Sequence, residues 1–307
     1  MLKLLKKILI IAVFIFALDF SIGLVLRHFY FAQKMGTAHH ITQCIEKTKA
    51  DILIFGTSRA QHSYNPEIFE KSLGKSCYNV GQAGLNIFFT LAIQRCVLKR
   101  YTPEIMILEV FPIDLLAESK EEYNRLSYLL PYYSKHDELR DIINLRSPYE
   151  KFKMLSGIYP YNSLLLPLIY NNVFEMNYKY QKGYIPLEQT MNAAQKEKMN
   201  YKEIKIDQNQ LSAFESFITN ARNAGCQLYV AISPLYTEAN AAYATGLQTT
   251  LAVLAKHKIK LWDYSADPRF NDVQFFKDPI HINDKGAQTY SAIVADRIKT
   301  EFAYVKN

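Results

Sequence analysis

Serine, aspartate and histidine can together turn a hydroxyl into a nucleophile, and here they occur in two motifs far apart in a chain of 307 residues. Ser58 follows the apolar run Asp51–Phe55, and Gly56 between them permits a tight turn that presents the hydroxyl. Asp278 precedes His281 by three residues, a spacing at which a carboxylate can hold the imidazole in one tautomer while its other nitrogen faces a serine. The pattern indicates acyl chemistry through a serine nucleophile.

Each motif also has a purely structural interpretation. Thr57 or Ser58 could cap a following helix, because serine and threonine are common N-cap residues. His281 could simply lie at the start of the final helix, with Asn283 or Asp284 as the cap. Each motif alone is therefore weakly specific, and their joint occurrence is what favours catalysis.

The segments around these motifs alternate between short apolar runs and stretches with helical spacing. Strands are predicted at 51–55, 77–80, 105–110, 227–232 and 260–263, and helices at 66–73, 87–100, 208–223, 238–257 and 284–302. This alternation predicts an α/β fold, a three-layer α/β/α sandwich around a mostly parallel five-stranded sheet. Functional residues of such sheets collect beyond the carboxyl ends of strands, the position expected for segments 56–59, 79–84, 109–114 and 278–281.

The chain starts with Met-Leu-Lys-Leu-Leu-Lys-Lys, and the following run from Ile8 to Leu26 is almost wholly apolar apart from Asp19. Its length is about what a helix needs to cross the hydrocarbon of a bilayer. A carboxylate near mid-membrane costs about 2.5–3.5 kcal/mol, which a long apolar run tolerates. The lysines before the run predict a cytoplasmic N-terminus and a periplasmic or extracellular location for the remainder. A cleavable signal peptide is the alternative, but no Ala-x-Ala-like site follows closely.

These patterns predict a basic start and membrane anchor at residues 1–34, a connector at 35–50 and one α/β domain at 51–307. Within that domain the alternation stops between about 115 and 205, and eleven of the 22 tyrosines lie between Tyr123 and Tyr184. This tyrosine-rich segment is predicted to be an insertion. Its rings suit core packing or a sugar face.

The net charge of +7 does not indicate nucleic-acid binding. Residues 1–34 carry five basic residues against Asp19, a local net charge of +4, which leaves +3 for all the rest. No basic patch remains after this subtraction, and nucleic acid is not an expected partner.

Cysteines and histidines show no spacing typical of a metal site. The four cysteines are expected to be buried free thiols: Cys44, Cys77, Cys96 and Cys226. Four histidines are expected to be surface or core residues: His39, His40, His62 and His136. The sequence therefore predicts neither a metal nor a cofactor.

Together the motifs resemble those of the SGNH, or GDSL, hydrolases. The family's first block, Gly-Asp-Ser, is similar to Gly-Thr-Ser at 56–58; the second, Asn-x-Gly-x-x-Gly, recurs at 79–84; the last, Asp-x-x-His, recurs at 278–281. The resemblance covers roughly residues 50–113 and 206–302. It implies the SGNH-hydrolase fold, which is flavodoxin-like, and an activity without metal or nucleotide.

The resemblance also implies residue roles. Ser58 would attack an ester or thioester carbonyl, His281 would take its proton, and Asp278 would orient His281. The backbone N–H groups of Ser58 and Gly84 would stabilise the oxyanion.

The chain departs from the family at the third block, Gly-x-Asn-Asp, which is replaced by Glu-Val-Phe-Pro-Ile-Asp at 109–114. The usual asparagine donor to the oxyanion is therefore missing, and Asn86 is the nearest substitute by sequence. Glu109 is the candidate for a structural carboxylate. Arg59, beside the nucleophile, is expected either to contact substrate or to lie on a helix surface.

This divergence resembles membrane-anchored branches of the family that acylate envelope polymers, including proteins similar to those of alginate acetylation and D-alanyl transfer to teichoic acid. The resemblance implies O-acyl or O-acetyl transfer to a surface glycan, with an acyl donor, a polysaccharide acceptor and a membrane protein that supplies the acyl group. One alternative is an extracytoplasmic carboxylesterase or deacetylase that uses the same residues. An alternative of another class is a non-catalytic, membrane-bound scaffold that binds glycan.

Overall fold

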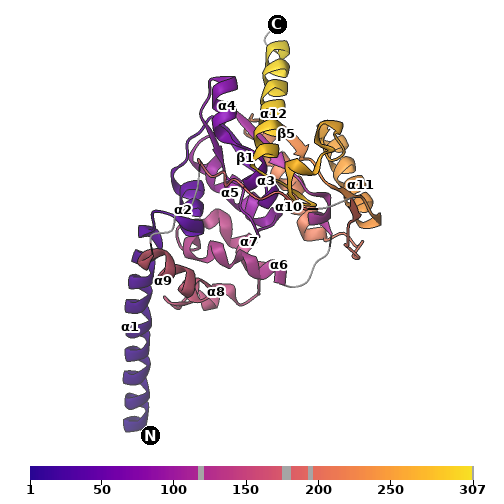
Figure 1. Ribbon diagram of the computed structural model, residues 1–307. Coiled ribbons are helices and arrows are strands. Elements are labelled where there is room, and N and C mark those ends of the chain that lie inside the picture. Colours follow the sequence, from indigo (N-terminus) through magenta and orange to yellow (C-terminus); the bar gives the residue numbers. More distant parts are fainter. Residues whose placement is uncertain (117–120, 175–180, 193–195, 306–307) are drawn as a thin grey trace. The chain divides into compact units, whose positions relative to one another are not determined.

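The computed structural model of the protein describes residues 1–116, 121–174, 181–192 and 196–305 (Figure 1). The chain forms two compact units, each described by itself below. The smaller unit consists of residues 1–43 and 123–177, and the larger consists of residues 44–122 and 178–307. The middle of the predicted insertion at 115–205 thus belongs to the same unit as the N-terminal helix, and its two ends belong to the larger unit.

The larger unit is built on a five-stranded, wholly parallel sheet with the strand order β2-β1-β3-β5-β7. Its strands are β1 (Ile52–Phe55), β2 (Cys77–Asn79), β3 (Ile105–Glu109), β5 (Gln227–Ile232) and β7 (Leu261–Asp263). Every residue of β1 and β3 is buried, as expected where a continuous apolar run forms a strand covered on both faces. The predicted mixed α/β class and five-stranded parallel sheet are confirmed.

Helices cover both faces of this sheet. On one face, Ile52 and Ile54 share a core with residues of α3 (Ser58–Ser63), α4 (Pro66–Leu73) and α12 (Asp284–Val305). On the other, α5 (Ile87–Arg100) packs with α10 (Gln208–Asn223), and the ring of Phe55 lies 5.1 Å from that of Phe217. Successive strand residues point to opposite faces, so the run 52–55 supplies both cores. The arrangement is compatible with an α/β/α sandwich.

Capping side chains explain several helix boundaries. Asn65 accepts the N–H of Glu67 at the start of α4, and Asp207 accepts two N–H groups at the start of α10. Helix α11 (Ala241–Lys256) begins three residues later than predicted, because Asn240 caps it by accepting the N–H of Tyr243. The remaining short strands of this unit are β4 (Glu197–Lys198), β6 (Thr237–Glu238), β8 (Phe276–Asp278) and β9 (His281–Ile282).

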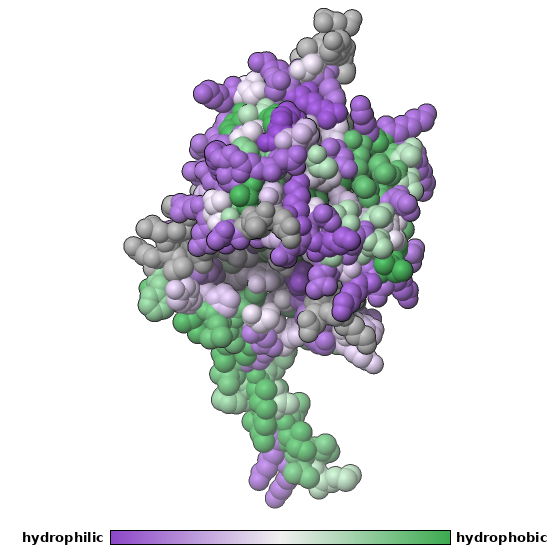
Figure 2. Space-filling model, turned by 45° about the vertical axis from the view of Figure 1, so that its right-hand side comes forward, coloured by the Kyte–Doolittle hydropathy of each residue, from purple (hydrophilic) through white to green (hydrophobic). Residues whose placement is uncertain are grey.

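The smaller unit is built around α1 (Leu2–Ala32), which is long and apolar enough to cross a membrane and is the one such helix in the described part of the chain. Figure 2 shows α1 as a continuous apolar column, with polar side chains near its free end. The predicted N-terminal apolar helix is therefore confirmed. The other elements here are α2 (Gly36–Thr42), η3 (Arg125–Tyr132), α7 (Arg140–Asn144), α8 (Glu150–Lys153), η5 (Tyr159–Leu164) and α9 (Leu165–Val173).

Several of the clustered tyrosines form the core of this unit. Tyr132 and Tyr161 pack against Tyr30 of α1 with ring centroids 6.0 and 5.7 Å away, and all three rings are buried. The hydroxyl of Tyr132 lies 2.6 Å from Thr42 Oγ1, which satisfies both groups. The sequence suggested that the tyrosine rings either pack in a core or bind a sugar face. Tyr132 and Tyr161 of the insertion pack in a core.

Candidate active site

The structure brings Ser58, His281 and Asp278 together in the larger unit. Ser58 Oγ lies 2.7 Å from His281 Nε2, although the two residues are 223 positions apart in the chain. His281 Nδ1 lies 3.0 and 2.9 Å from the two carboxylate oxygens of Asp278. The three side chains predicted to form the catalytic group are therefore connected by hydrogen bonds in the order Ser58, His281, Asp278.

The partners of His281 determine its tautomer. A carboxylate only accepts hydrogen bonds, so Nδ1 carries the proton that is donated to Asp278. In a neutral imidazole with this tautomer, Nε2 is the unprotonated nitrogen and accepts the hydroxyl proton of Ser58. This is the tautomer that a general base for the serine needs.

Local structure explains why each motif presents its side chain. At Gly56 the backbone has φ of 144°, and a Cβ there would lie 2.8 Å from the carbonyl oxygen of Glu109, so only glycine fits this turn. Asp278 and His281 face each other across the antiparallel pair β8–β9, which places their side chains together over a two-residue turn. The three-residue spacing is thus a property of a hairpin.

The contacts show which residues near the two motifs cap helices. Thr57 makes no side-chain cap of α3, and the hydroxyl of Ser58 is bonded to His281 instead. The start of α12 is capped by Asn283, which accepts the N–H of Gly286 at 3.0 Å. Asn283 therefore caps the final helix, and Asp278 instead accepts the backbone N–H groups of Ile280 and His281, each at 2.9 Å.

Asp278 remains ionised at neutral pH. Partial burial tends to raise its pKa, but hydrogen bonds from the imidazole of His281 and from two backbone N–H groups outweigh burial, and its pKa lies below the ordinary value. A carboxyl group with a depressed pKa in the folded state contributes stability above its unfolded pKa, and that stability is lost as the pH falls through the folded pKa.

His62 is a site residue that the sequence analysis missed. Its ring lies 6.1 Å from that of His281 in an edge arrangement, and Nδ1 donates to the carbonyl of Ile185 at 2.8 Å. Burial lowers the pKa of His62, so it stays neutral and adds no positive charge beside the imidazolium that His281 would form. The sequence feature that could have indicated His62 is its position four residues after Ser58, because residues with this spacing lie on the same face of a helix.

The second motif, residues 79–84, forms the loop after β2. Asn79 is buried; its amide donates to the carbonyls of Ala60 and Tyr64, and its oxygen accepts the N–H of Gly81 at 3.0 Å. The loop is thereby tied to the helix that begins at Ser58. In the described part of the chain, the N–H groups of Ser58 and Gly84 donate to no protein acceptor.

Asn86, the predicted substitute donor to the oxyanion, has a structural role in the fold. It is the N-cap of α5, where its side-chain oxygen accepts the N–H of Phe89 at 3.4 Å, and the residue is buried. Helix capping by asparagine is common and accounts for this contact.

Arg59 does not lie on a helix surface, and that alternative is wrong: it is among the largest fully buried side chains. Nε donates to Glu109 at 3.0 Å, and the other two nitrogens donate to the carbonyls of Ile280 and Ser233. The guanidinium therefore points into the protein, one residue from the nucleophile. Through Ile280 it also binds the turn between Asp278 and His281.

Glu109 is the centre of this buried network, as its predicted structural role requires. It accepts hydrogen bonds from Arg59, from the hydroxyl of Tyr64 at 2.5 Å, and from the N–H and hydroxyl of Ser233. Burial and the charge of Glu109 raise the pKa of Tyr64 well above its usual value, so Tyr64 remains a donor. Glu109 thus connects Arg59 and Tyr64 with Ser233, which follows β5.

Glu109→Gln is expected to lower the free energy of unfolding by about 3–5 kcal/mol, because removing one partner of a buried ion pair leaves the other charge uncompensated. Urea unfolding of the full chain in detergent, followed by the fluorescence of Trp262, measures this. The matched control is Glu104→Gln, which breaks the exposed pair between Lys75 and Glu104. That change should cost at most about 1 kcal/mol. Equal, small losses in both variants would contradict the role given to Glu109.

A small apolar cavity adjoins the turn that carries the nucleophile. Gly56 and Thr57 line it together with Ile87, Phe111 and Phe214, and its volume is about 20 Å³. A water molecule requires about 10–15 Å³ on the same measure, so the cavity has room for one small group.

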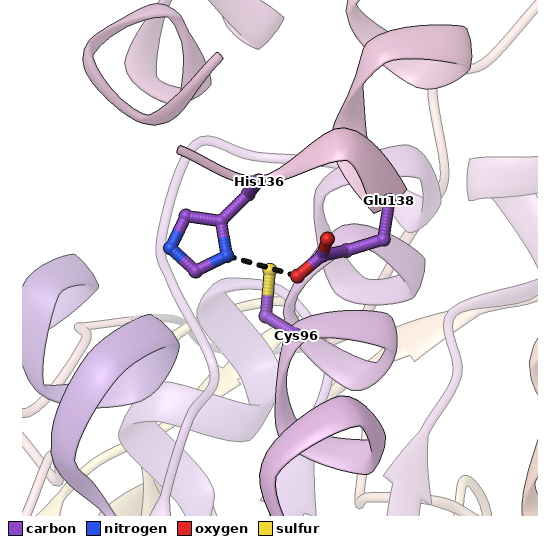
Figure 3. Close-up of side chains that lie close together, drawn as sticks. All are labelled: Cys96, His136 and Glu138. Carbon is purple, nitrogen blue, oxygen red and sulfur yellow. Dashed lines mark hydrogen bonds and ion pairs between the residues drawn. The ribbon is translucent and has the colours of Figure 1, made fainter. Parts of the chain in front are cut away.

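All four cysteines are buried free thiols, as predicted. In the smaller unit, His136 Nδ1 lies 2.9 Å from Glu138 Oε1 (Figure 3). The third residue drawn there, Cys96, belongs to α5 of the larger unit, so the pair itself supplies two ligands, fewer than catalytic zinc sites use.

No protein-family model matches the chain, and no curated protein matches it significantly.

Proposed function

We propose that the larger unit is an SGNH-type serine acyltransferase or esterase, with Ser58 as nucleophile, His281 as general base and Asp278 as the group that orients His281. The observation that carries the proposal is the 2.7 Å contact between Ser58 Oγ and Nε2 of His281, whose other ring nitrogen lies 2.9 Å from a carboxylate oxygen of Asp278. Nucleophile and base within hydrogen-bond reach, with the base held by a third group, are the signature of this chemistry.

The proposed reaction has two halves. Ser58 Oγ attacks the acyl carbonyl as His281 takes its proton, and the resulting oxyanion accepts the N–H groups of Ser58 and Gly84. The bond to the leaving group then breaks, and His281 returns the proton to the departing oxygen. In the second half, a hydroxyl of the acceptor gives its proton to His281 and attacks the acyl-serine, which releases the acylated product and restores Ser58.

Short acyl groups suit the site best. The cavity beside Gly56 and Thr57 has a volume of about 20 Å³ and apolar walls, which supports an acetyl-sized group over a long chain. The acceptor in this proposal is an envelope glycan, and the donor is an acyl ester or a membrane protein that carries the acyl group. Hydrolysis is the second candidate, and the partial exposure of His281, 18% of its side chain, favours it because water can approach.

We propose that α1 anchors this activity to a membrane as a single span. The lysines before the apolar run support a cytoplasmic N-terminus and an active site on the periplasmic or extracellular side. The exposed apolar surface along α1 supports lipid contact, since its large apolar side chains from Leu2 to Phe20 are each at least 50% exposed.

The test is covalent labelling of the purified full chain by a fluorophosphonate, which reacts with activated serines. We expect one labelled peptide, containing Ser58, and no label after Ser58→Ala. The matched control is Ser63→Ala, on the same helix, which should leave labelling unchanged. Absence of label in the folded wild-type protein would refute the proposal and favour the scaffold alternative.

A further inference from the structure

We infer that residues 145–174 form a second membrane-binding element, which enters the leaflet at the C-terminal end of α1 and lies against that helix among the lipids. The inference rests on the proposed insertion of α1 but not on the proposed acyl transfer. The occupant of its apolar surface would be the acyl chains of the bilayer.

The carboxylate of Asp19, within the apolar run of α1, carries the argument. It accepts the hydroxyl of Ser156 at 2.6 Å, the N–H of Gly157 at 2.6 Å and the N–H of Ile158 at 3.4 Å. The backbones are in close contact here, since a Cβ on Gly23 would lie 2.5 Å from the carbonyl carbon of Gly157. A charged residue inside a span normally marks a functional contact, and here the partner is a turn of the same unit.

This contact sets the depth of the turn. Asp19 lies seven residues before Leu26, the end of the apolar run, which is about 10 Å along a helix with a rise of 1.5 Å per residue. Near the end of the segment, Asn172 donates to the carbonyl of Phe29 at 3.3 Å. The segment therefore follows α1 from beyond the apolar run down to about a third of a 30 Å hydrocarbon core.

The chemistry of the segment fits that position. The charged residues of the segment all precede Met154, and Glu150 pairs there with Arg146 and Lys153. No acidic or basic residue occurs from Met154 to Phe174. Six large apolar side chains of the segment have 59–81% of their surface exposed: Tyr149, Phe152, Leu155, Leu166, Ile169 and Val173. Three of them, Leu166, Ile169 and Val173, recur at the spacing of one face of α9. A water-facing surface of this kind would be costly, whereas lipid removes the cost.

The backbone also meets the requirement of a lipid environment, in which every unpaired polar group is expensive. From Met154 to Tyr161 each N–H has an acceptor, apart from Pro160, which has no N–H. Asp19 supplies the acceptor for two of them. The carboxylate of Asp19 and the N–H groups of the turn thus meet each other's hydrogen-bonding requirement. This pairing explains how both polar groups can lie within the hydrocarbon of the bilayer.

The segment cannot be a second span. Gly157, Pro160 and Pro167 interrupt it, and both ends of the 123–177 stretch connect to the larger unit. The chain therefore returns to the side from which it came, and the element dips into one leaflet only.

Fluorescence quenching by lipids brominated on their acyl chains tests the inference in the full chain reconstituted in phosphatidylcholine vesicles. Leu155→Trp and Leu166→Trp report the segment, and Phe14→Trp reports α1. The matched control is Leu251→Trp, an exposed leucine of α11 in the larger unit. Wild type supplies the background, because its single tryptophan, Trp262, is buried in that unit's core.

We expect the two segment variants to lose a share of fluorescence comparable with that lost by Phe14→Trp, and Leu251→Trp to lose none beyond background. Quenching of Phe14→Trp without quenching of either segment variant would overturn this inference alone. Failure to quench Phe14→Trp would overturn the anchor as well. Neither result bears on the labelling of Ser58.

Discussion

Ser58→Ala is expected to lower kcat for hydrolysis of a short-chain aryl ester by about 10⁴-fold or more, because the attacking oxygen is removed and only binding and oxyanion stabilisation remain. An aryl acetate is the suitable substrate, since the cavity lined by Gly56 and Thr57 has room for one small group. The measurement is steady-state turnover of the purified full chain in detergent.

Stability should change little in the same variant. Ser58 is partly exposed and its hydroxyl bonds to one side chain, His281, so the melting temperature should stay within a few degrees of wild type. Ser63→Ala removes a buried hydroxyl from the same helix and should leave turnover near the wild-type value. Retention of turnover by Ser58→Ala would mean that another residue attacks the substrate.

Asp278→Asn is expected to lower kcat by at least about 10²-fold, equivalent to about 2.7 kcal/mol of barrier. The amide would favour the wrong tautomer of His281 and would remove the charge that stabilises the imidazolium. Loss of this group in serine triads costs as much as about 10⁴-fold. Both effects arise at once because the single N–H of His281 Nδ1 faces both carboxylate oxygens of Asp278, at 3.0 and 2.9 Å.

The pH profile supplies a second check on Asp278. Its pKa lies below the ordinary value of about 3.9, so it is ionised at every pH above roughly 5, and the ratio of wild-type to variant kcat should stay constant there. The matched control is Asp284→Asn, three residues beyond His281 at the start of α12, which should leave kcat almost unchanged. A loss smaller than about threefold in Asp278→Asn would place His281 outside a triad.

Much of the fold was predictable because its signals are local. Helices α4, α5 and α10 and strand β5 have the predicted bounds. Asn65 and Asp207 supply caps within two or three residues of the N–H groups they accept, and β1 is a continuous apolar run. Helix capping and apolar patterning depend on residues that are close together in the chain, so a single sequence is enough to predict them.

The site was predictable only in part. Ser58, Asp278 and His281 stand in recognisable motifs, but their meeting depends on the parallel order of the sheet, which brings residues 223 positions apart within 2.7 Å. The position of Arg59 illustrates the limit. An arginine after a strand is compatible with either surface or interior, and burial became favourable because Glu109, on another strand, supplies the compensating charge.

In the N-terminal half of the smaller unit, too, some features follow from the sequence and others depend on the tertiary structure. Sequence alone determined that α1 is apolar, long and preceded by lysines, because these are properties of composition. Only the tertiary structure decided what Asp19 does there. Its partners Ser156 and Gly157 lie 137 and 138 residues away, and no local pattern links a carboxylate to backbone N–H groups at that separation. Contacts between distant segments depend on the path of the whole chain, which periodicity and capping do not encode.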